Sequence, residues 1–167
     1  NWHNMKGRTL KAAILRTLGV DSTTFVKECL KIDPLSQGCL YEQAAATDDY
    51  DLWLKTMRTE SHNFKELAQE YIEAGLYEDA IRILRACPQK DPICWYTLGY
   101  VYKQLKEGEK AKEAFENGEK SCPDYCFPNR VEEIRILHSV IEALPEAPMA
   151  HYYLGNLLYD KKQYKEA

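Results

Sequence analysis

The sequence has little of what marks several common classes of protein. No run of about 18 apolar residues occurs in it, so it predicts no transmembrane helix and no membrane partner. It has only 8 glycines and 7 prolines and no low-complexity stretch, as in an ordinary helical protein. Basic residues are not in excess, because the net charge is −4 and acidic and basic residues alternate along the chain. We therefore expect no nucleic-acid partner.

The chain also lacks the motifs of familiar catalytic and cofactor sites. It contains no glycine-rich phosphate loop and no nucleophile motif. Asp48, Asp49 and Asp51 lack the alternation and the glycine of a calcium loop. The histidines are scattered, without a partner at a telling spacing: His3, His62, His138 and His151. The sequence predicts no catalytic residue, no cofactor and no metal, and hence no enzyme.

Six cysteines do not form a metal-binding pattern. Cys122 and Cys126 are separated by three residues, but no second pair lies near them, and a structural zinc site needs four ligands. Cys29 and Cys87 fall at small packing positions, which predicts buried free thiols. Free thiols favour a reducing compartment, so we expect a cytoplasmic location.

One spacing pattern occurs three times. A bulky residue is followed by Leu three positions on, a small residue one further, and Tyr or Leu three after that. Positions with these offsets share one face of a helix. A second small residue follows 13 positions after the Leu. The three copies are Phe64, Leu67, Ala68, Tyr71 and Ala80; Trp95, Leu98, Gly99, Tyr102 and Ala111; and His151, Leu154, Gly155, Leu158 and Ala167.

Each copy predicts a helix, a tight turn and an antiparallel helix. The small residue of the first helix lets the second approach closely, with Ala111 expected opposite Gly99. Gly75 is expected to end its helix in the left-handed conformation, and Lys106 occupies the matching place in the next copy. The third copy stops at Ala167, within its expected second helix.

These residues resemble the tetratricopeptide repeat, a helix–turn–helix unit of 34 residues. The match is closest between Pro92 and Tyr125, where the motif positions are filled by Trp95, Leu98, Gly99, Tyr102, Ala111, Phe115 and Pro123. The resemblance implies an all-α fold, a right-handed α-α superhelix built as a solenoid of antiparallel helix pairs.

The rest of the chain is helical in pattern but departs from the repeat. One predicted stripe on a helix face consists of Leu10, Ala13, Ile14, Thr17 and Leu18, and a second, apolar stripe consists of Val131, Ile134, Leu137, Ile141 and Leu144. We expect one continuous solenoid domain that is a fragment of a longer chain. Its predicted parts are divergent helical repeats at 1–60, two clear units at 61–125, an inserted single helix at 126–147 and a truncated unit at 148–167.

Ligands of tetratricopeptide repeats usually contact the first helix of each pair, just off the packing stripe. Transferring those positions predicts partner-binding residues in each copy: Lys65, Gln69 and Glu73; Tyr96, Tyr100 and Lys103; and Tyr152, Asn156 and Tyr159. The tyrosines suit a binding surface, because Tyr gives large, rigid, amphipathic contact area. Alternatively, these rings pad the inserted helix or a neighbouring domain.

Two functional hypotheses follow. The first is a protein-interaction module that binds a peptide or partner domain through a concave, Tyr-rich groove. The second is a structural scaffold that packs against other domains of a larger protein, because the sequence also resembles the repeat region of large bacterial proteins. The interrupted third copy also predicts self-association through exposed apolar surface.

Overall fold

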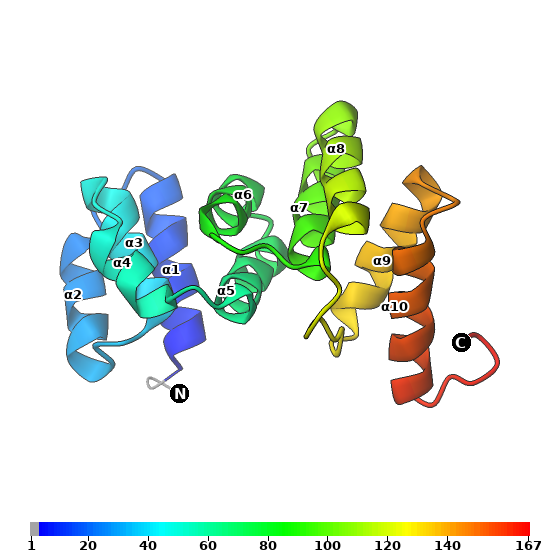
Figure 1. The fold of residues 1–167 in the computed structure, drawn as a ribbon. Coiled ribbons are helices and arrows are strands. Elements are labelled where there is room, and N and C mark those ends of the chain that lie inside the picture. Colours follow the sequence, from blue (N-terminus) through cyan, green and yellow to red (C-terminus); the bar gives the residue numbers. More distant parts are fainter. Residues whose placement is uncertain (1–3) are drawn as a thin grey trace. The chain divides into compact units, whose positions relative to one another are not determined.

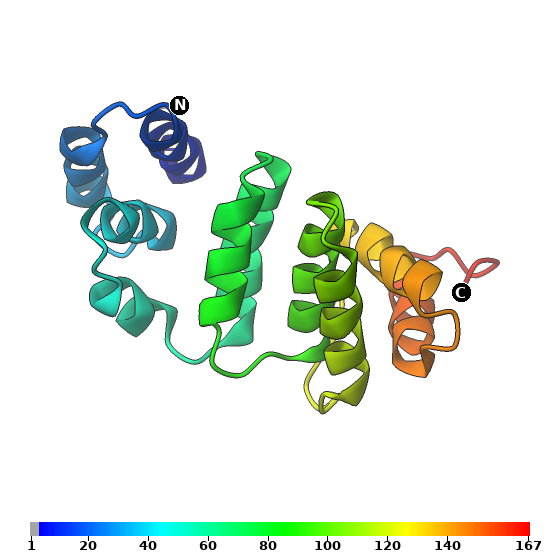
Figure 2. The same cartoon turned by 90° about the horizontal axis from the view of Figure 1, so that it is seen from above.

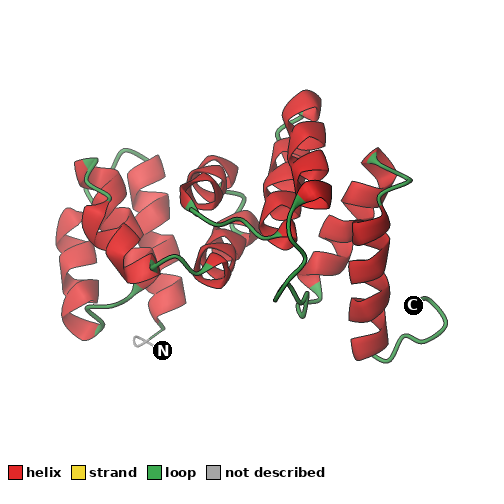
Figure 3. Ribbon diagram, in the orientation of Figure 1, coloured by secondary structure: helices red, strands yellow, loops and turns green. Residues whose placement is uncertain are grey.

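The computed structural model describes residues 4–167, and in that part of the chain all regular secondary structure is helical (Figure 3). The all-α prediction is thus confirmed, whereas His3 lies outside the described residues. The chain divides into two compact units, Asn1–Leu76 and Tyr77–Ala167, which are taken in turn.

The first unit contains five helices within its described residues (Figure 1). The first helix packs against the second, third and fifth, and the third also contacts the second and fourth. Their bounds are α1 Met5–Thr17, α2 Thr23–Ile32, α3 Gln37–Thr47, α4 Asp51–Met57 and α5 Ser61–Glu73.

Aromatic rings fill the core of the first unit. The Tyr41 ring lies edge-on to both Trp53 and Tyr71, with centroids 5.2 Å apart in each pair. Trp53 in turn meets Phe64 at 5.8 Å. All four side chains are buried, and such edge-to-face pairs add roughly 0.5–1.5 kcal/mol each beyond their burial. The rings therefore join α3, α4 and α5 into one core.

The apolar stripe expected on α1 is wrong in part. Ala13 is buried as expected, but Ile14 and Leu18 are 49% and 72% exposed, and the helix buries Thr9 and Ala12 in their place. The reason is a close approach to α3, because a Cβ added at Gly38 would lie 2.4 Å from Thr9 Cγ2. Only short side chains fit between backbones at that separation.

A buried carboxylate links three helices of this unit. Glu42, on α3, is fully buried. Arg16 of α1 donates to it twice, from Nε at 2.8 Å and from Nη2 at 3.1 Å. Tyr71 of α5 donates its hydroxyl to Glu42 Oε1 at 2.6 Å. The charge is therefore paired and hydrogen-bonded, as burial of a carboxylate requires.

We expect Glu42→Ala to lower the free energy of unfolding by about 3 kcal/mol, because it leaves the Arg16 charge and the Tyr71 hydroxyl without their acceptor. Urea unfolding followed by circular dichroism measures the loss. Lys6→Ala is the control, since its ion pair with Glu73 is exposed and its removal costs below about 1 kcal/mol. Equal losses in both variants would contradict a special role for the buried carboxylate.

The second unit also contains five helices. The second helix of the unit packs against the helices before and after it and against the fourth. The last helix contacts the fourth and the third. Their bounds are α6 Tyr77–Ala86, α7 Pro92–Gln104, α8 Gly108–Lys120, α9 Glu132–Ala143 and α10 Pro148–Asp160.

Glycine on each helix of the α7–α8 hairpin receives an aromatic ring from the other helix. A Cβ added at Gly99 would lie 2.4 Å from Phe115 Cδ1 and 3.0 Å from the Ala111 carbonyl oxygen. A Cβ added at Gly118 would lie 2.3 Å from Tyr96 Cε1. The predicted approach of Gly99 to Ala111 is therefore confirmed, and α7 and α8 lie side by side (Figure 2).

The helix that carries the repeated pattern ends in the same way in each copy. α5, α7 and α10 each have 13 residues, and the second residue after each helix has a positive φ: Gly75 at 74°, Lys106 at 62° and Lys162 at 61°. At each end, two backbone N–H groups bond back to carbonyls three and five residues earlier. The left-handed Gly75 is thus confirmed, and lysine adopts the same turn at a steric cost.

Two further expectations need correction. A helix, α9, does form between 126 and 147, but Val131 is 64% exposed and the buried residues include Ile136, Leu137 and Val140. Residues 161–167 form turns and not a second helix. The few residues after the turn at Lys162 are too short for a helix to persist without packing. The division of the chain into repeat units stays a prediction.

We expect Gly99→Ala to lower the free energy of unfolding by roughly 1–3 kcal/mol, because the added methyl overlaps the Phe115 ring and faces backbone that cannot move freely. Gly108→Ala, at the start of α8, is the matched control, since a Cβ there meets nothing within 4 Å. Denaturant unfolding compares the two. An unchanged Gly99→Ala protein would show that α7 and α8 do not meet closely at this position.

Candidate partner-binding surface

The predicted binding residues are divided between the two units. Lys65, Gln69 and Glu73 lie on α5 in the first unit, and the other six lie in the second. Gln69 is 4% exposed and donates to Glu73 Oε1 at 3.3 Å, and Glu73 also accepts from Lys6 at 3.2 Å. The prediction that Gln69 presents an open binding surface is therefore wrong, because its side chain is buried and hydrogen-bonded to Glu73. Binding by Lys65 and Glu73 stays a prediction.

Tyr96 is a core residue and not part of an open groove. Its side chain is fully buried, its ring lies against Gly118, and its hydroxyl donates to Glu119 on α8. Burial, and then the hydrogen bond to the carboxylate, hold the pKa of the Tyr96 phenol well above its usual range. The expected exposure of Tyr96 is thus wrong. The sequence signal for this packing is Gly118, because a glycine inside a helix leaves room for a large side chain from the neighbouring helix.

Tyr100 and Lys103 pack against α9, as the alternative interpretation of these rings anticipated. The Arg135 guanidinium lies 5.6 Å from the centre of the Tyr100 ring. Lys103 Nζ donates to Glu142 Oε2 at 2.7 Å. Both residues therefore hold α9 on α7, and their remaining exposed surface is what a partner could contact.

The Lys103–Glu142 pair gives a pH-dependent link between α7 and α9. The hydrogen bond from Lys103, and then its charge, lower the pKa of Glu142 below the ordinary value of 4.5. Because the pKa of Glu142 is lower in the folded state than in the unfolded state, the pair stabilises the fold fully when the pH is above the unfolded-state pKa. This stabilisation is lost as the pH falls through the folded-state pKa of Glu142.

We expect Lys103→Met to raise the pKa of Glu142 towards its ordinary value, since the ammonium donor is replaced by a thioether of similar length. A ¹³C NMR titration of the Glu142 side-chain carboxyl between pH 2 and 7 measures it (roughly the range over which a carboxyl titrates). Lys106→Met is the control, because Lys106 is also an exposed lysine but is not the partner of Glu142. An identical Glu142 titration in the wild type and in Lys103→Met would contradict the pairing.

Three predicted residues remain together on one exposed face of α10. Tyr152 is 59% exposed and Tyr159 67%, and Asn156 between them is also exposed. Tyr152 and Asn156 border a cavity of about 460 Å³, whose other walls come from the loop before α9 and the end of α10: Cys126, Phe127, Pro128, Asn129 and Asp160. We call Phe127, Tyr152, Asn156 and Tyr159 the α10 surface.

Phe127 is the member of this surface that the sequence did not predict. Its side chain is 78% exposed beside Pro128, in the loop before α9. The sequence signal that could have indicated it is an aromatic residue in a loop. An exposed ring there does not stabilise the fold by packing, and it contributes to binding when a partner covers it.

The α10 surface is positioned by contacts from α8. Glu119 accepts the backbone N–H groups of Met149 at 3.1 Å and Ala150 at 3.0 Å, in the first turn of α10. Ala147, at the cap position, has no side chain able to do this. Glu119 thus satisfies free donors and places negative charge at the positive end of the helix. On the buried side, Tyr153 meets the Tyr96 ring at 6.5 Å.

No family model matches the chain, and no curated protein matches it. Among solved structures, the crystal structure of MamA matches with 21% sequence identity and a TM-score of 0.40, covering 93% of this chain and 97% of that chain. In residues 4–167, no helix is long and apolar enough to cross a membrane. In the same residues, no three His, Cys, Asp or Glu side chains are grouped as metal ligands.

Proposed function

We propose that this protein is an interaction module that binds an extended segment of a partner protein at the α10 surface. The observation that carries the proposal is that Phe127, Tyr152 and Asn156 border one cavity while their side chains are exposed. The proposal retains the tetratricopeptide-like organisation in helix pairs, and it moves the centre of binding to α10.

The chemistry of this surface suits a peptide with both apolar and polar contacts. Aromatic rings such as Phe127 and Tyr152 bury large area at little entropic cost and dominate the energy of many interfaces. The Asn156 amide carries a donor and an acceptor, which match the N–H and C=O of an extended backbone. Asp160 borders the same cavity and favours a partner with a basic residue at that end.

A structural scaffold is the second candidate, and one observation favours it. Tyr100 and Lys103, both predicted to bind a partner, instead contact α9 of the same unit. Rings and charges at these positions can therefore serve packing alone. On this candidate, the α10 surface packs against another domain of a longer protein and does not bind a separate ligand.

A displayed library of random peptides, selected against the immobilised chain of residues 1–167, tests the first candidate. We expect Tyr152→Ser to weaken the selected peptides about tenfold, the loss of one aromatic contact of about 1.4 kcal/mol. Asn156→Ala should weaken them less. The melting temperature should stay nearly unchanged, because both side chains are exposed.

His138→Ser is the matched control, since His138 is exposed on α9 and lies outside the α10 surface. Equal affinity of the selected peptides for the wild type and for Tyr152→Ser would refute binding at this surface. A selection that yields no peptide would favour the scaffold.

A further inference from the structure

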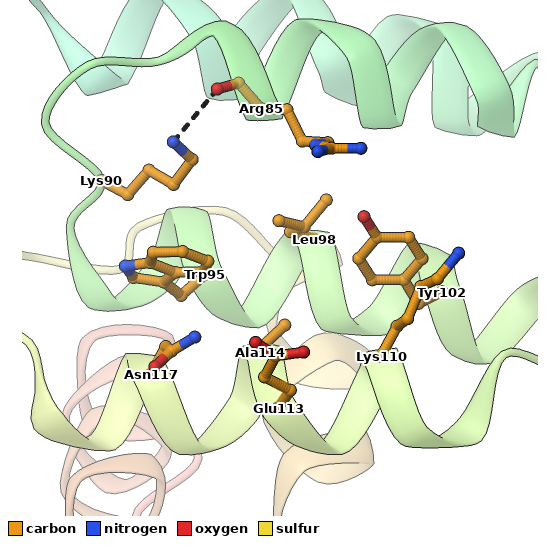
Figure 4. A pocket seen from close by; sticks show the side chains of 9 residues that line it. All are labelled: Arg85, Lys90, Trp95, Leu98, Tyr102, Lys110, Glu113, Ala114 and Asn117. Carbon is orange, nitrogen blue, oxygen red and sulfur yellow. Dashed lines mark hydrogen bonds between the residues drawn. The ribbon is translucent and has the colours of Figure 1, made fainter.

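A second cavity lies in the second unit, away from the α10 surface. Its volume is about 370 Å³, within the range of small-molecule sites. Helices α6, α7 and α8 and the loop between α6 and α7 supply its walls (Figure 4). The lining residues are Arg85, Lys90, Trp95, Leu98, Tyr102, Lys110, Glu113, Ala114 and Asn117. We call it the α7 cavity.

The floor of the α7 cavity is apolar. Trp95, Leu98 and Tyr102 lie along one face of α7, at the spacing of three and four residues that aligns side chains on a helix. Leu98 and Tyr102 are largely buried, at 3% and 9% exposure, so the floor is fixed by packing. Figure 4 shows the Trp95 and Tyr102 rings on either side of Leu98. A flat apolar group would find dispersion contacts along this row.

The rim of the cavity is cationic. Arg85, Lys90 and Lys110 come from three different segments, and Glu113 is the one acidic residue of the lining. Three positive charges and one negative charge give the lining a formal charge of +2, in a chain whose net charge is −4. The excess of positive charge is thus local to this cavity and does not follow from composition.

Two of the three cations are already held by the protein. Lys90 Nζ donates to the carbonyls of Cys87 at 2.6 Å and Arg85 at 3.1 Å, and it lies 5.3 Å from the centre of the Trp95 ring. Lys110 pairs with Glu107 at 2.5 Å and lies 5.6 Å from the centre of the Tyr102 ring. Cation–π contacts of this kind fix the ammonium groups over the floor.

Arg85 differs from both lysines. In the described residues its guanidinium has no carboxylate within ion-pair distance, and its side chain faces the α7 floor across the cavity from Glu113 and Asn117 (Figure 4). Its charge is felt at Lys110, because the pKa of Lys110 is raised chiefly by the hydrogen bond that its ammonium donates to Glu107, while the charge of Arg85 acts in the opposite direction. The planar Arg85 guanidinium, which carries five N–H donors, is thus available to a ligand at the rim.

We propose that the α7 cavity binds a small organic anion, one acidic group carried on a flat apolar body. Arg85 binds the acidic group, with Lys110 adding positive charge on the same side. The body lies on the row formed by Trp95, Leu98 and Tyr102. This site is independent of the peptide-binding surface proposed on α10.

Other small ligands fit the same walls less well. An inorganic anion would use the rim and leave the apolar floor in water. A neutral aromatic molecule would cover the floor and leave the Arg85 charge without a partner, at a desolvation cost. A cation would be repelled by a lining of formal charge +2. Only a ligand with both features uses both parts of the cavity.

The test uses 2-naphthoate as the probe and two partial probes, inorganic phosphate and 2-naphthalenemethanol. Binding to the chain of residues 1–167 is followed by ¹H–¹⁵N NMR, with the indole N–H of Trp95 as the reporter. We expect 2-naphthoate to shift this signal and to bind at least about tenfold more tightly than either partial probe, since each lacks one of the two contacts. Similar affinities for 2-naphthoate and 2-naphthalenemethanol would overturn the role of the rim.

The decisive comparison is between two substitutions that remove charges of opposite sign from the cavity. Arg85→Gln should weaken 2-naphthoate roughly tenfold, and Glu113→Gln should strengthen it roughly two- to threefold, because the first removes attraction and the second removes repulsion. Lys112→Gln, an exposed α8 residue outside this cavity, is the control and should change little. All three positions are exposed, so folding should be kept. The same affinity in Arg85→Gln and Lys112→Gln, or shifts confined to signals other than Trp95 and its neighbours, would overturn the proposal.

Discussion

Each unit depends on the satisfaction of one carboxylate by groups from other helices. Glu42 receives a guanidinium from α1 and a phenol from α5, and Glu119 receives a phenol from α7 and the first backbone N–H groups of α10. Glu42 is fully buried and Glu119 is half-buried, so both carboxylates lose water contacts that these hydrogen bonds replace. The helices that supply them are thereby fixed in position.

This requirement decides which aromatic residues remain for binding. The hydroxyls of Tyr71 and Tyr96 are hydrogen-bonded to the two carboxylates, and the ring of Tyr100 is covered in part by Arg135. Tyr152 and Tyr159 do not bind either carboxylate and are exposed on α10. The binding surface is therefore the part of a Tyr-rich sequence that packing leaves free, and the capped N-terminus of α10 holds it in place.

Helical spacing was sufficient to predict α5, α7 and α10, the left-handed turn at Gly75 and the contact of Gly99 with α8. Those features are local or involve a single pair of helices. Spacing failed where several neighbours surround one helix. α7 is buried on most of its circumference, so Tyr96, beside Trp95 in sequence, is in the core as well. The buried face of α9 was predicted only in part, since Leu137 is buried but Val131 is exposed, because periodicity does not say which neighbours arrive from distant segments. The α7 cavity was missed for the same reason, since its cations come from three segments.

The reciprocal glycine contacts of α7 and α8 also have a mechanical consequence. Phe115 of α8 occupies the space at Gly99, and Tyr96 of α7 occupies the space at Gly118. Sliding one helix along the other by a turn, about 5.4 Å, would drive both rings into positions that carry larger side chains. The two helices of the hairpin therefore resist sliding along one another. A force applied at either end would be transmitted along both helices together.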